Sequence, residues 1–557
     1  DMTSGGQMTS STSRSDVIWN VGYTIINTAN GVIENAQEVG LDAALVAEAN
    51  FFRAFHYFSL VQTFGGVPLD LGSGELKFNT TPSRVSVRNT VPEVYTKAIF
   101  PDLKYAVDNL PDSPRQTGTV AKTVALLYLA KAYLTYGWWL QNPNNIPTYP
   151  ECARTDPDGH DANWYFQQAY NVAVEGIENA GTSYGLLDYF YDVHLGSNDR
   201  NKEILLYTDH TENSEFYNGA SLTYGGGGAP GNFAGWMVTC QTENIRSATD
   251  AAGSNWVSSV IRTDAQDIGR PWTRMATPIG VFTNTFANKT EDSRYDGTFV
   301  SVYRANFNVY SIPGLYNANF MPVYPDDAIL SFLPEDLATH ADYSNAIYKS
   351  NVAAGVVPGR ADYVMEPSFI NRQYYPGNWK LGPYRTNTTG IGQPNAESTR
   401  PFNIAKFSEL YLIAAEAAVK GATPVADKSA RDLVNVLRAR AGKWRWDHAG
   451  NVAKNEDHSA AMIAATPATI TIDYILEERS REFFGEGYRW FDLVRTQKWD
   501  EIAGSYQICE GNAANRTPQT FIRTIEPHHY LRPIPQTQID GMEMTAEEKI
   551  AYQNPGY

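Results

Sequence analysis

A helical pattern that recurs in pairs is the feature that most constrains the fold of this chain. Residues 41–64 carry apolar side chains at helical spacing, Gly65 and Gly66 then end the pattern, and a second helical pattern runs over 91–110. Three further pairs follow the same plan: 120–136 with 162–180, 404–420 with 429–441, and 470–484 with 488–499. The sequence therefore predicts four helix pairs.

Small residues stand where the two helices of a pair must approach closely. Ala130, Ala132, Ala169 and Ala173 lie in the second pair, and the third pair contains a run of alanines within 414–418. Helical hairpins that stack on one another, as in tetratricopeptide repeats, need such residues at their contacts. We therefore predict a mostly α fold, although no strict repeat length is present.

The middle of the chain differs in composition from both ends. Residues 201–400 are rich in Gly, Asn, Thr, Pro and aromatic residues, with short strand-like runs at 203–208, 298–302 and 307–311. Long irregular segments inside a compact protein usually carry function. We predict one domain over 1–557. Its parts are a helical scaffold (41–200 and 401–500), a variable region (201–400) and an irregular C-terminal segment (501–557).

Charge and motif content exclude several classes of protein. The chain has 44 basic and 61 acidic side chains, a net charge of −17, which opposes binding to a phosphate backbone. No run of about 18 apolar residues is present, so no membrane span is predicted. No HExxH motif occurs and the three Cys are far apart. We predict no cofactor and no metal site; the DPDGHD turn (156–161) leaves a structural Ca²⁺ as an open alternative.

Two motifs resemble catalytic sites but lack the required context. GTSYG (181–185) follows a predicted helix, whereas the nucleophile elbow of a serine hydrolase follows a strand. Glu478 and Glu482 lie one helical turn apart and would project side by side, but the two carboxylates of a glycosidase flank the bond from opposite sides. Arginines and carboxylates alternate around this pair, which predicts a structural ion-pair network; the members are Arg479, Arg481, Arg489, Arg495, Glu477, Glu486 and Asp492.

Aromatic residues among polar loops are the most informative feature of the variable region. The set comprises Trp236, Trp256, Trp272, Tyr303, Tyr310, Tyr375 and Trp379. A flat ring next to a bidentate donor offers a sugar an apolar face and partners for its hydroxyl groups. Ordinary packing of a large irregular region is the alternative interpretation of the same residues.

Several segments together resemble the SusD/RagB family of Bacteroidetes surface nutrient-binding lipoproteins. They span nearly the whole chain in order: 47–69, 121–137, 406–421, 433–442, 475–499, 529–540 and 553–557. The resemblance implies a single α-helical domain in which four tetratricopeptide-like units cradle a variable ligand-binding region. That fold agrees with the one predicted from the helical pattern.

The resemblance also implies a function. A member of this family is a non-enzymatic protein that captures oligosaccharide or polysaccharide and acts as the lid of a SusC-like TonB-dependent transporter. It is held on the extracellular face of the outer membrane by a lipidated N-terminal Cys, which this sequence does not contain. A relative that captures peptides is the first alternative, and a glycoside hydrolase on a helical scaffold is the second.

Candidate ligand-binding residues follow from the resemblance of 270–299 to the stretch in which family members place a stacking aromatic. It implies Trp272 as the platform with Arg274 as a hydroxyl donor. Trp236, in the loop after the glycine run 225–228, is the second candidate. Weaker candidates are Asp70, Phe78, Trp379 and Arg372. From the acidic net charge we expect a neutral ligand rather than an anionic one.

Overall fold

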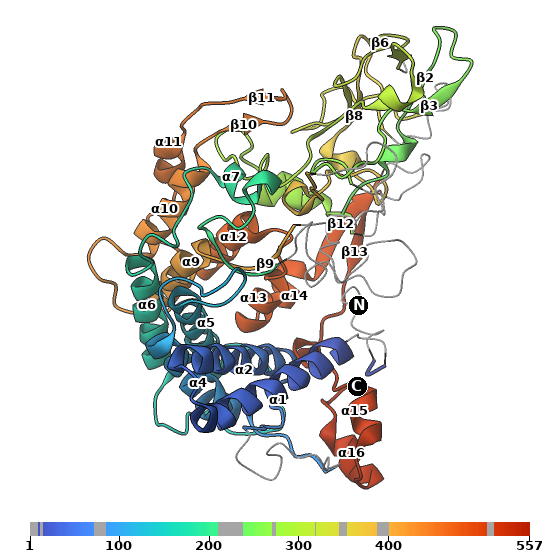
Figure 1. Cartoon of the computed structure of the whole chain (residues 1–557). Helices are drawn as coiled ribbons and strands as arrows, with labels where there is room; N and C mark the ends of the chain where they lie inside the picture. The colour runs from blue at the N-terminus through green and yellow to red at the C-terminus, as the bar shows by residue number, and fades with distance from the viewer. Residues whose placement is uncertain are drawn as a thin grey trace.

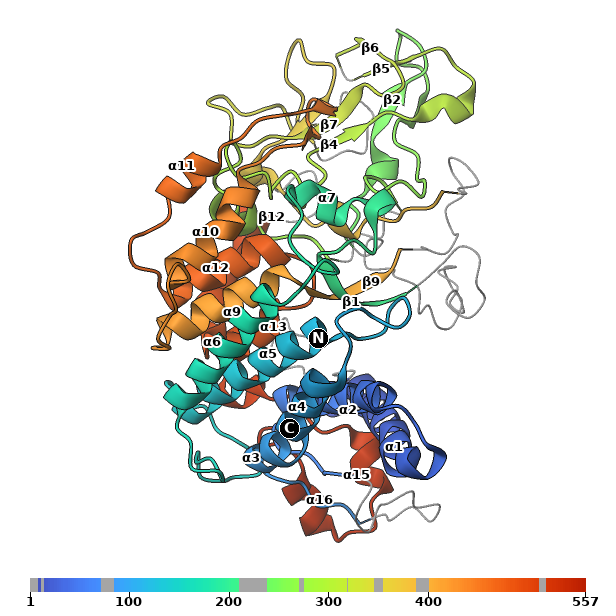
Figure 2. The same cartoon turned by 60° about the vertical axis from the view of Figure 1, so that its left-hand side comes forward.

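The computed structural model describes residues 9–11, 15–71, 85–209, 238–269, 275–317, 319–344, 354–386, 400–509 and 517–557. Helices at one end of the molecule and short strands at the other are joined by a central helical stack (Figures 1 and 2). The helices are α1 (Ser15–Val39), α2 (Ala43–Phe64), α3 (Val91–Val94), α4 (Phe100–Asn109), α5 (Lys122–Gln141), α6 (Ala162–Glu178), α7 (Phe190–His194), α9 (Ser408–Val419), α10 (Ala430–Ala441), α11 (Ser459–Ala464), α12 (Ile472–Phe483), α13 (Arg489–Arg495), α14 (Trp499–Ala503), α15 (Gln536–Gly541) and α16 (Ala546–Tyr552).

Successive helices pack on one another in a continuous series. Helix α1 contacts α2, and the contacts then run through α4, α5 and α6 to α9, which also contacts α10 and α12. All four predicted helix pairs are confirmed, and a π-helix at Tyr95–Ile99 joins α3 to α4. Helix α1 extends over 25 residues and precedes the first predicted pair.

Local signals explain where the scaffold helices begin, end and approach. The Asp42 side chain accepts a hydrogen bond from the Ala44 N–H at the start of α2, and Gly65 ends that helix at a φ of 79°. Glycine also permits close helix contacts. A Cβ on Gly137 would lie 2.8 Å from the Phe166 ring, so α5 and α6 could not approach as they do.

One strand pair closes the scaffold at the base of the variable region. Strand β1 (Ile204–Thr208) pairs antiparallel with β9 (Phe402–Lys406), although almost 200 residues separate them in sequence. The chain therefore leaves the scaffold and returns to it at the same place. This pairing makes the middle of the chain an insertion with its own apolar core, separate from that of the helices.

The variable region contains two small sheets. The first has the order β3-β2-β5-β6 and the second β4-β7-β8, in which only β7 and β8 are parallel. The strands are β2 (Arg246–Ala248), β3 (Trp256–Ser258), β4 (Val302–Arg304), β5 (Leu315–Tyr316), β6 (Pro322–Val323), β7 (Ala328–Phe332) and β8 (Tyr363–Met365). The strand expected at 203–208 is confirmed, but 307–311 is not a strand, since Phe307–Tyr310 forms a 3₁₀-helix.

The C-terminal segment is more ordered than expected. Strands β12 (Ser505–Cys509) and β13 (Pro518–Ile522) form an antiparallel hairpin, and the two short helices α15 and α16 follow. A further hairpin, β10 (Trp446–Asp447) with β11 (Val452–Ala453), lies after α10. Figure 1 shows the β12–β13 hairpin between α14 and the variable region. It therefore connects the scaffold side of the molecule to the insertion.

A buried ion network joins the scaffold to the variable region. Glu478 of α12 binds Arg438 of α10 and Arg294 of the variable region, each at 2.8 Å. One turn later, Glu482 binds Arg440, which also holds Glu203 at the start of β1. The predicted structural role of Glu478 and Glu482 is thereby confirmed. Because every one of these side chains is buried, their charges compensate one another and hold three separate parts of the chain in register.

Candidate functional site

Four of the candidate residues named from the sequence lie outside the described residues: Trp272, Arg274, Trp236 and Phe78. Arg372 is exposed. Asp70 is half-buried at the end of the segment after α2, where its backbone carbonyl accepts hydrogen bonds from Tyr57 and Asn30. No described cavity brings Asp70, Arg372 and Trp379 together.

Trp379 is a core residue, which contradicts the prediction that it stacks on a ligand. Its side chain is only 3% exposed and belongs to the apolar core of the variable region. One face of its ring stacks on Tyr191 with a centroid distance of 4.7 Å, and His448 lies 4.9 Å away. The same holds for Tyr303 and Tyr375, which are also buried. These rings offer no free face to a sugar.

A spacious cavity lies between the variable region and the second half of the scaffold. This large cleft has a volume of about 960 Å³, within the range that ligand sites occupy. Its walls come from the segment 275–285, from α12, from α13 with the loop before it, from α14 and from the β12–β13 hairpin. The segment 275–285 lies within the stretch 270–299 that the resemblance indicated and directly follows Arg274 in sequence.

The inner part of the large cleft is formed by a group of ion-paired side chains. Arg479 is 2% exposed and donates from Nε to Asp492 and from one Nη to Glu409, both at 2.8 Å. Asp492 in turn accepts from Arg495 at 2.9 Å. Burial alone would raise the pKa of Asp492, but the two guanidiniums outweigh it and lower that pKa to about 2. Asp492 is therefore an acceptor and not a proton donor at neutral pH.

The outer part of the large cleft combines rings with polar donors. On the β12–β13 hairpin, Tyr506 stacks on Phe521 at 5.3 Å, and the Arg523 guanidinium lies 4.5 Å from the Tyr506 ring. Gln507 and Thr520 of the same hairpin are joined by a hydrogen bond of 3.1 Å and also line the cleft. An apolar ring face beside planar and hydroxyl donors is the combination that binds a sugar.

Further aromatic side chains line the wall formed by the scaffold. They are Phe483, Phe484, Tyr488 and Trp490. The indole nitrogen of Trp490 is buried and has no hydrogen-bond partner among the described residues. A buried donor without a partner is costly, which makes it a position where a ligand acceptor would be favourable.

Sequence reasoning missed these residues for two reasons. Trp490 and Arg489 lie in a run that indicated only a structural ion network, and the expectation for Arg489 is wrong: it forms no ion pair with any described residue and donates to the Leu476 carbonyl. Tyr506 and Arg523 lie in the segment expected to be irregular. The alternation of polar and apolar residues in 505–508 was an available signal for a strand there.

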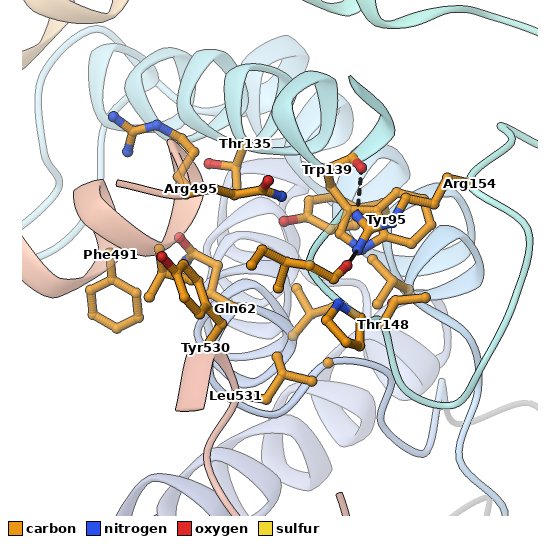
Figure 3. A pocket seen from close by; sticks show the side chains of 17 residues that line it. Gln62, Tyr95, Thr135, Trp139, Thr148, Arg154, Phe491, Arg495, Tyr530 and Leu531 are labelled. Atoms are coloured by element: carbon orange, nitrogen blue, oxygen red, sulfur yellow. Dashed lines mark hydrogen bonds between the residues drawn. The ribbon is translucent and has the colours of Figure 1, made fainter. Parts of the chain in front are cut away.

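A second, much smaller pocket lies within the scaffold (Figure 3). It has a volume of about 80 Å³ and is lined by side chains that include Tyr95, Trp139 and Tyr530. Arg154 stacks on Trp139 at 4.5 Å and donates to its carbonyl at 2.6 Å, as the dashed line in Figure 3 marks. A pocket of this volume is too small for a sugar chain, so the large cleft is the candidate site.

No described group of His, Cys, Asp and Glu side chains could hold a metal ion. In the DPDGHD turn, Asp156 accepts hydrogen bonds from Tyr165 and from the His160 N–H, and Asp161 accepts from the Trp164 N–H at the start of α6. Both carboxylates therefore have structural partners. Among the described helices, none has the length and apolarity that crossing a membrane requires.

Two family models match different parts of this chain. A family model described as "SusD family" matches residues 202–557, and one described as "Starch-binding associating with outer membrane" matches residues 2–134. Among curated relatives, the SusD-like protein P2 of Formosa agariphila is 37% identical over 126 residues, 21% of this chain and 24% of that protein. The chain spans about a quarter to a third of the length of the curated relatives it matches.

Solved structures resemble the whole fold at low sequence identity. A laminarin-binding SusD-like protein is 22% identical with a TM-score of 0.55, and the match covers 98% of this chain and 86% of that one. Surface glycan-binding protein A from Bacteroides fluxus is 16% identical with a TM-score of 0.56, covering 99% and 87%. At these identities the likeness shows the fold alone.

Proposed function

Because the chain belongs to the SusD family, we propose that it is a non-enzymatic glycan-binding protein whose site is the large cleft. The observation that carries the proposal is the lining of this cleft: aromatic rings on two walls, with guanidinium, amide and hydroxyl donors between them. Solved structures of the same fold include one described as laminarin-binding, which supports a carbohydrate ligand.

The carboxylates near the cleft support binding without catalysis. Asp492 is the one carboxylate among the described lining residues, and two arginines hold it. Glu478 and Glu482, the pair that resembles a glycosidase site, are buried and ion-paired, and neighbouring cations hold the pKa of each well below its usual value despite burial. A general acid needs a raised pKa and access to the bond, and neither residue has them.

The proposal extends to the cellular role implied by the resemblance. The protein would capture oligosaccharide or polysaccharide at the extracellular face of the outer membrane, held by a lipid anchor, and pass it to a SusC-like TonB-dependent transporter that it covers as a lid. The family model described as "associating with outer membrane" supports this location. Capture and release would require a modest affinity at a single site.

Affinity electrophoresis in gels that contain laminarin, xyloglucan or a polyuronate tests the proposal, together with an assay for reducing ends. We expect retarded migration in at least one gel and no new reducing ends. Tyr506→Ala removes the ring on which the Arg523 guanidinium packs and should weaken binding by about tenfold. Tyr105→Ala is the matched control, because Tyr105 is a half-exposed tyrosine of α4 that does not line the cleft.

The outcomes separate the candidate functions. Release of reducing sugar would overturn the binding-only proposal in favour of a glycoside hydrolase. Migration unaffected by every polysaccharide, with a heterogeneous peptide mixture copurifying, would favour the peptide-binding alternative. Equal retardation of the Tyr506→Ala variant and the parent protein would move the site away from the large cleft.

A further inference from the structure

The large cleft carries positive charge in a protein that is strongly negative overall. The chain has a net charge of −17, yet the charged side chains among the described lining residues are three arginines, Arg479, Arg489 and Arg523, and one carboxylate, Asp492. Because a cleft with low-dielectric walls focuses the field of its lining charges, this local excess matters more to a bound ligand than the net charge.

Two of the three arginines form no ion pair with a described residue, although Asp492 and Glu477 act on the charge of Arg489 from a longer distance. Asp492 is shared between Arg479 and Arg495, and Arg479 is further compensated by Glu409. In the described part of the chain, neither Arg489 nor Arg523 lies within ion-pair distance of a carboxylate. Arg489 donates to the Leu476 carbonyl at 2.9 Å and Arg523 to the Ala503 carbonyl at 2.7 Å. Both backbone contacts orient a guanidinium without cancelling its charge.

Buried donors at the same site lack acceptors. Arg479 is almost completely buried, and its second Nη atom has no partner among the described residues; the Nε of Arg523 is in the same state. An unmade hydrogen bond to a buried charged group is costly. Arginine donors without a partner also occur at Arg246, Arg440 and Arg481. What distinguishes the large cleft is that Arg489 and Arg523 line it and form no ion pair with any described residue.

We propose that the ligand of the large cleft is an anionic glycan, one whose sugar rings carry carboxylate or sulfate groups. The inference rests on the proposed glycan-binding function and specifies its substrate class. Guanidinium groups bind both kinds of anion through paired N–H donors, and Tyr506 provides a ring face beside Arg523. The net charge of the chain led us to expect a neutral ligand, but the arginines that line the cleft favour an anionic one.

Matched pairs of polymers that differ only in charge test this proposal by calorimetry. Polygalacturonate is compared with its methyl ester, which masks the carboxylates, and sulfated laminarin with laminarin. We expect the anionic member of at least one pair to bind tenfold or more tightly, and the pair that responds identifies carboxylate or sulfate as the recognised group. Raising NaCl from about 0.1 M to about 1 M shortens the Debye length from about 10 Å to about 3 Å and should weaken that binding strongly.

Charge-removing variants assign the preference to this cleft. Arg523→Gln and Arg489→Gln should each lower affinity for the anionic polymer by about tenfold or more, a larger loss than for its neutral partner. Arg115→Gln is the control, since it removes one positive charge from an exposed arginine paired with Glu48 outside the cleft. Urea denaturation of each variant identifies any loss of affinity caused by unfolding.

The outcomes distinguish the anionic substrate class from the glycan-binding function on which it rests. Equal, salt-insensitive binding of neutral and anionic polymers would overturn the anionic class and leave glycan binding intact. An anionic preference that persists in both arginine variants would overturn its assignment to this cleft. Binding to none of the polymers by the folded protein would overturn both the substrate class and the proposed function.

Discussion

Replacing Glu482 by Gln should destabilise the protein by about 3 kcal/mol at neutral pH. Glu482 is fully buried on α12, where it accepts a hydrogen bond from Arg440 at 2.5 Å and lies near Arg294 and Lys406. Gln keeps the shape of the side chain but removes its charge. The three cations would then be left with less compensation inside the network that joins the scaffold to the variable region.

The magnitude follows from the pKa of this carboxyl group. Burial alone would raise the pKa of Glu482, but Arg440, Lys406 and Arg294 outweigh it and lower that pKa from 4.5 to about 2. A difference of this size corresponds to about 3 kcal/mol of preferential interaction with the charged form. Removing one partner of a buried ion pair typically costs about 3–5 kcal/mol, which agrees.

The sign of the pH dependence is fixed by the same pKa. Because the pKa is lower in the folded protein, the charged form stabilises the fold above about pH 4.5, and this contribution is lost as the pH falls through about 2. The difference in unfolding free energy between the parent protein and Glu482→Gln should therefore be constant from pH 7 to about 5 and then shrink on acidification.

Urea denaturation followed by circular dichroism measures this difference. Glu477→Gln is the matched control: Glu477 lies on the same helix, its side chain is 61% exposed, and its nearest cation is 3.8 Å away. We expect this control to change the unfolding free energy by no more than about 0.5 kcal/mol. A Glu482→Gln variant as stable as the control, or a stability difference independent of pH, would refute the role assigned to the network.

Three further perturbations test the packing of the variable region. Gly382→Ala would place a Cβ 1.8 Å from the carbonyl oxygen of Gln266 and should cost about 1–3 kcal/mol in thermal unfolding, whereas Gly280→Ala meets no atom closer than 3.6 Å and should be neutral. Trp379→Ala should cost about 3–5 kcal/mol because it empties a core site, yet the protein that remains folded should retain glycan as the parent does. Burial of His448 opposes its charge, but a neighbouring carboxylate outweighs burial and raises its pKa. This contribution is present below about pH 6.5 and lost as pH rises through the higher folded value, so the stability lost in His448→Gln should be larger near pH 6 than near pH 9.

Much of the helical scaffold could be predicted because its signals are local. The apolar spacing of 41–64, the glycines that follow it and the small residues of the second pair act within a few turns of helix, and the structure places α2, α5 and α6 accordingly. Charge alternation over 474–495 likewise indicated that Glu478 and Glu482 are structural. Helix α1 was not among the predicted pairs, and α15 and α16 were missed because helices of six and seven residues have too few turns to show an apolar period.

The candidate site was predictable only in outline. The resemblance directed attention to 270–299, and the segment 275–285 does form one wall of the large cleft. The other walls bring Arg489 and Trp490 together with Tyr506 and Arg523, which belong to separate elements. Whether an arginine is paired or free depends on which carboxylates reach it, and Arg479 and Arg489 differ in this respect although they occupy the same charged run.

The amino-acid sequence by itself determined the mostly helical architecture, because periodicity, caps and small residues act over short distances along the chain. It also identified the family, through segments along nearly the whole chain that resemble SusD/RagB proteins. Only the tertiary structure decided that the Trp379 indole is enclosed, that β1 meets β9, and that two unpaired guanidiniums face a common cleft. Burial and charge pairing depend on neighbours contributed by distant segments, and no local pattern specifies those neighbours.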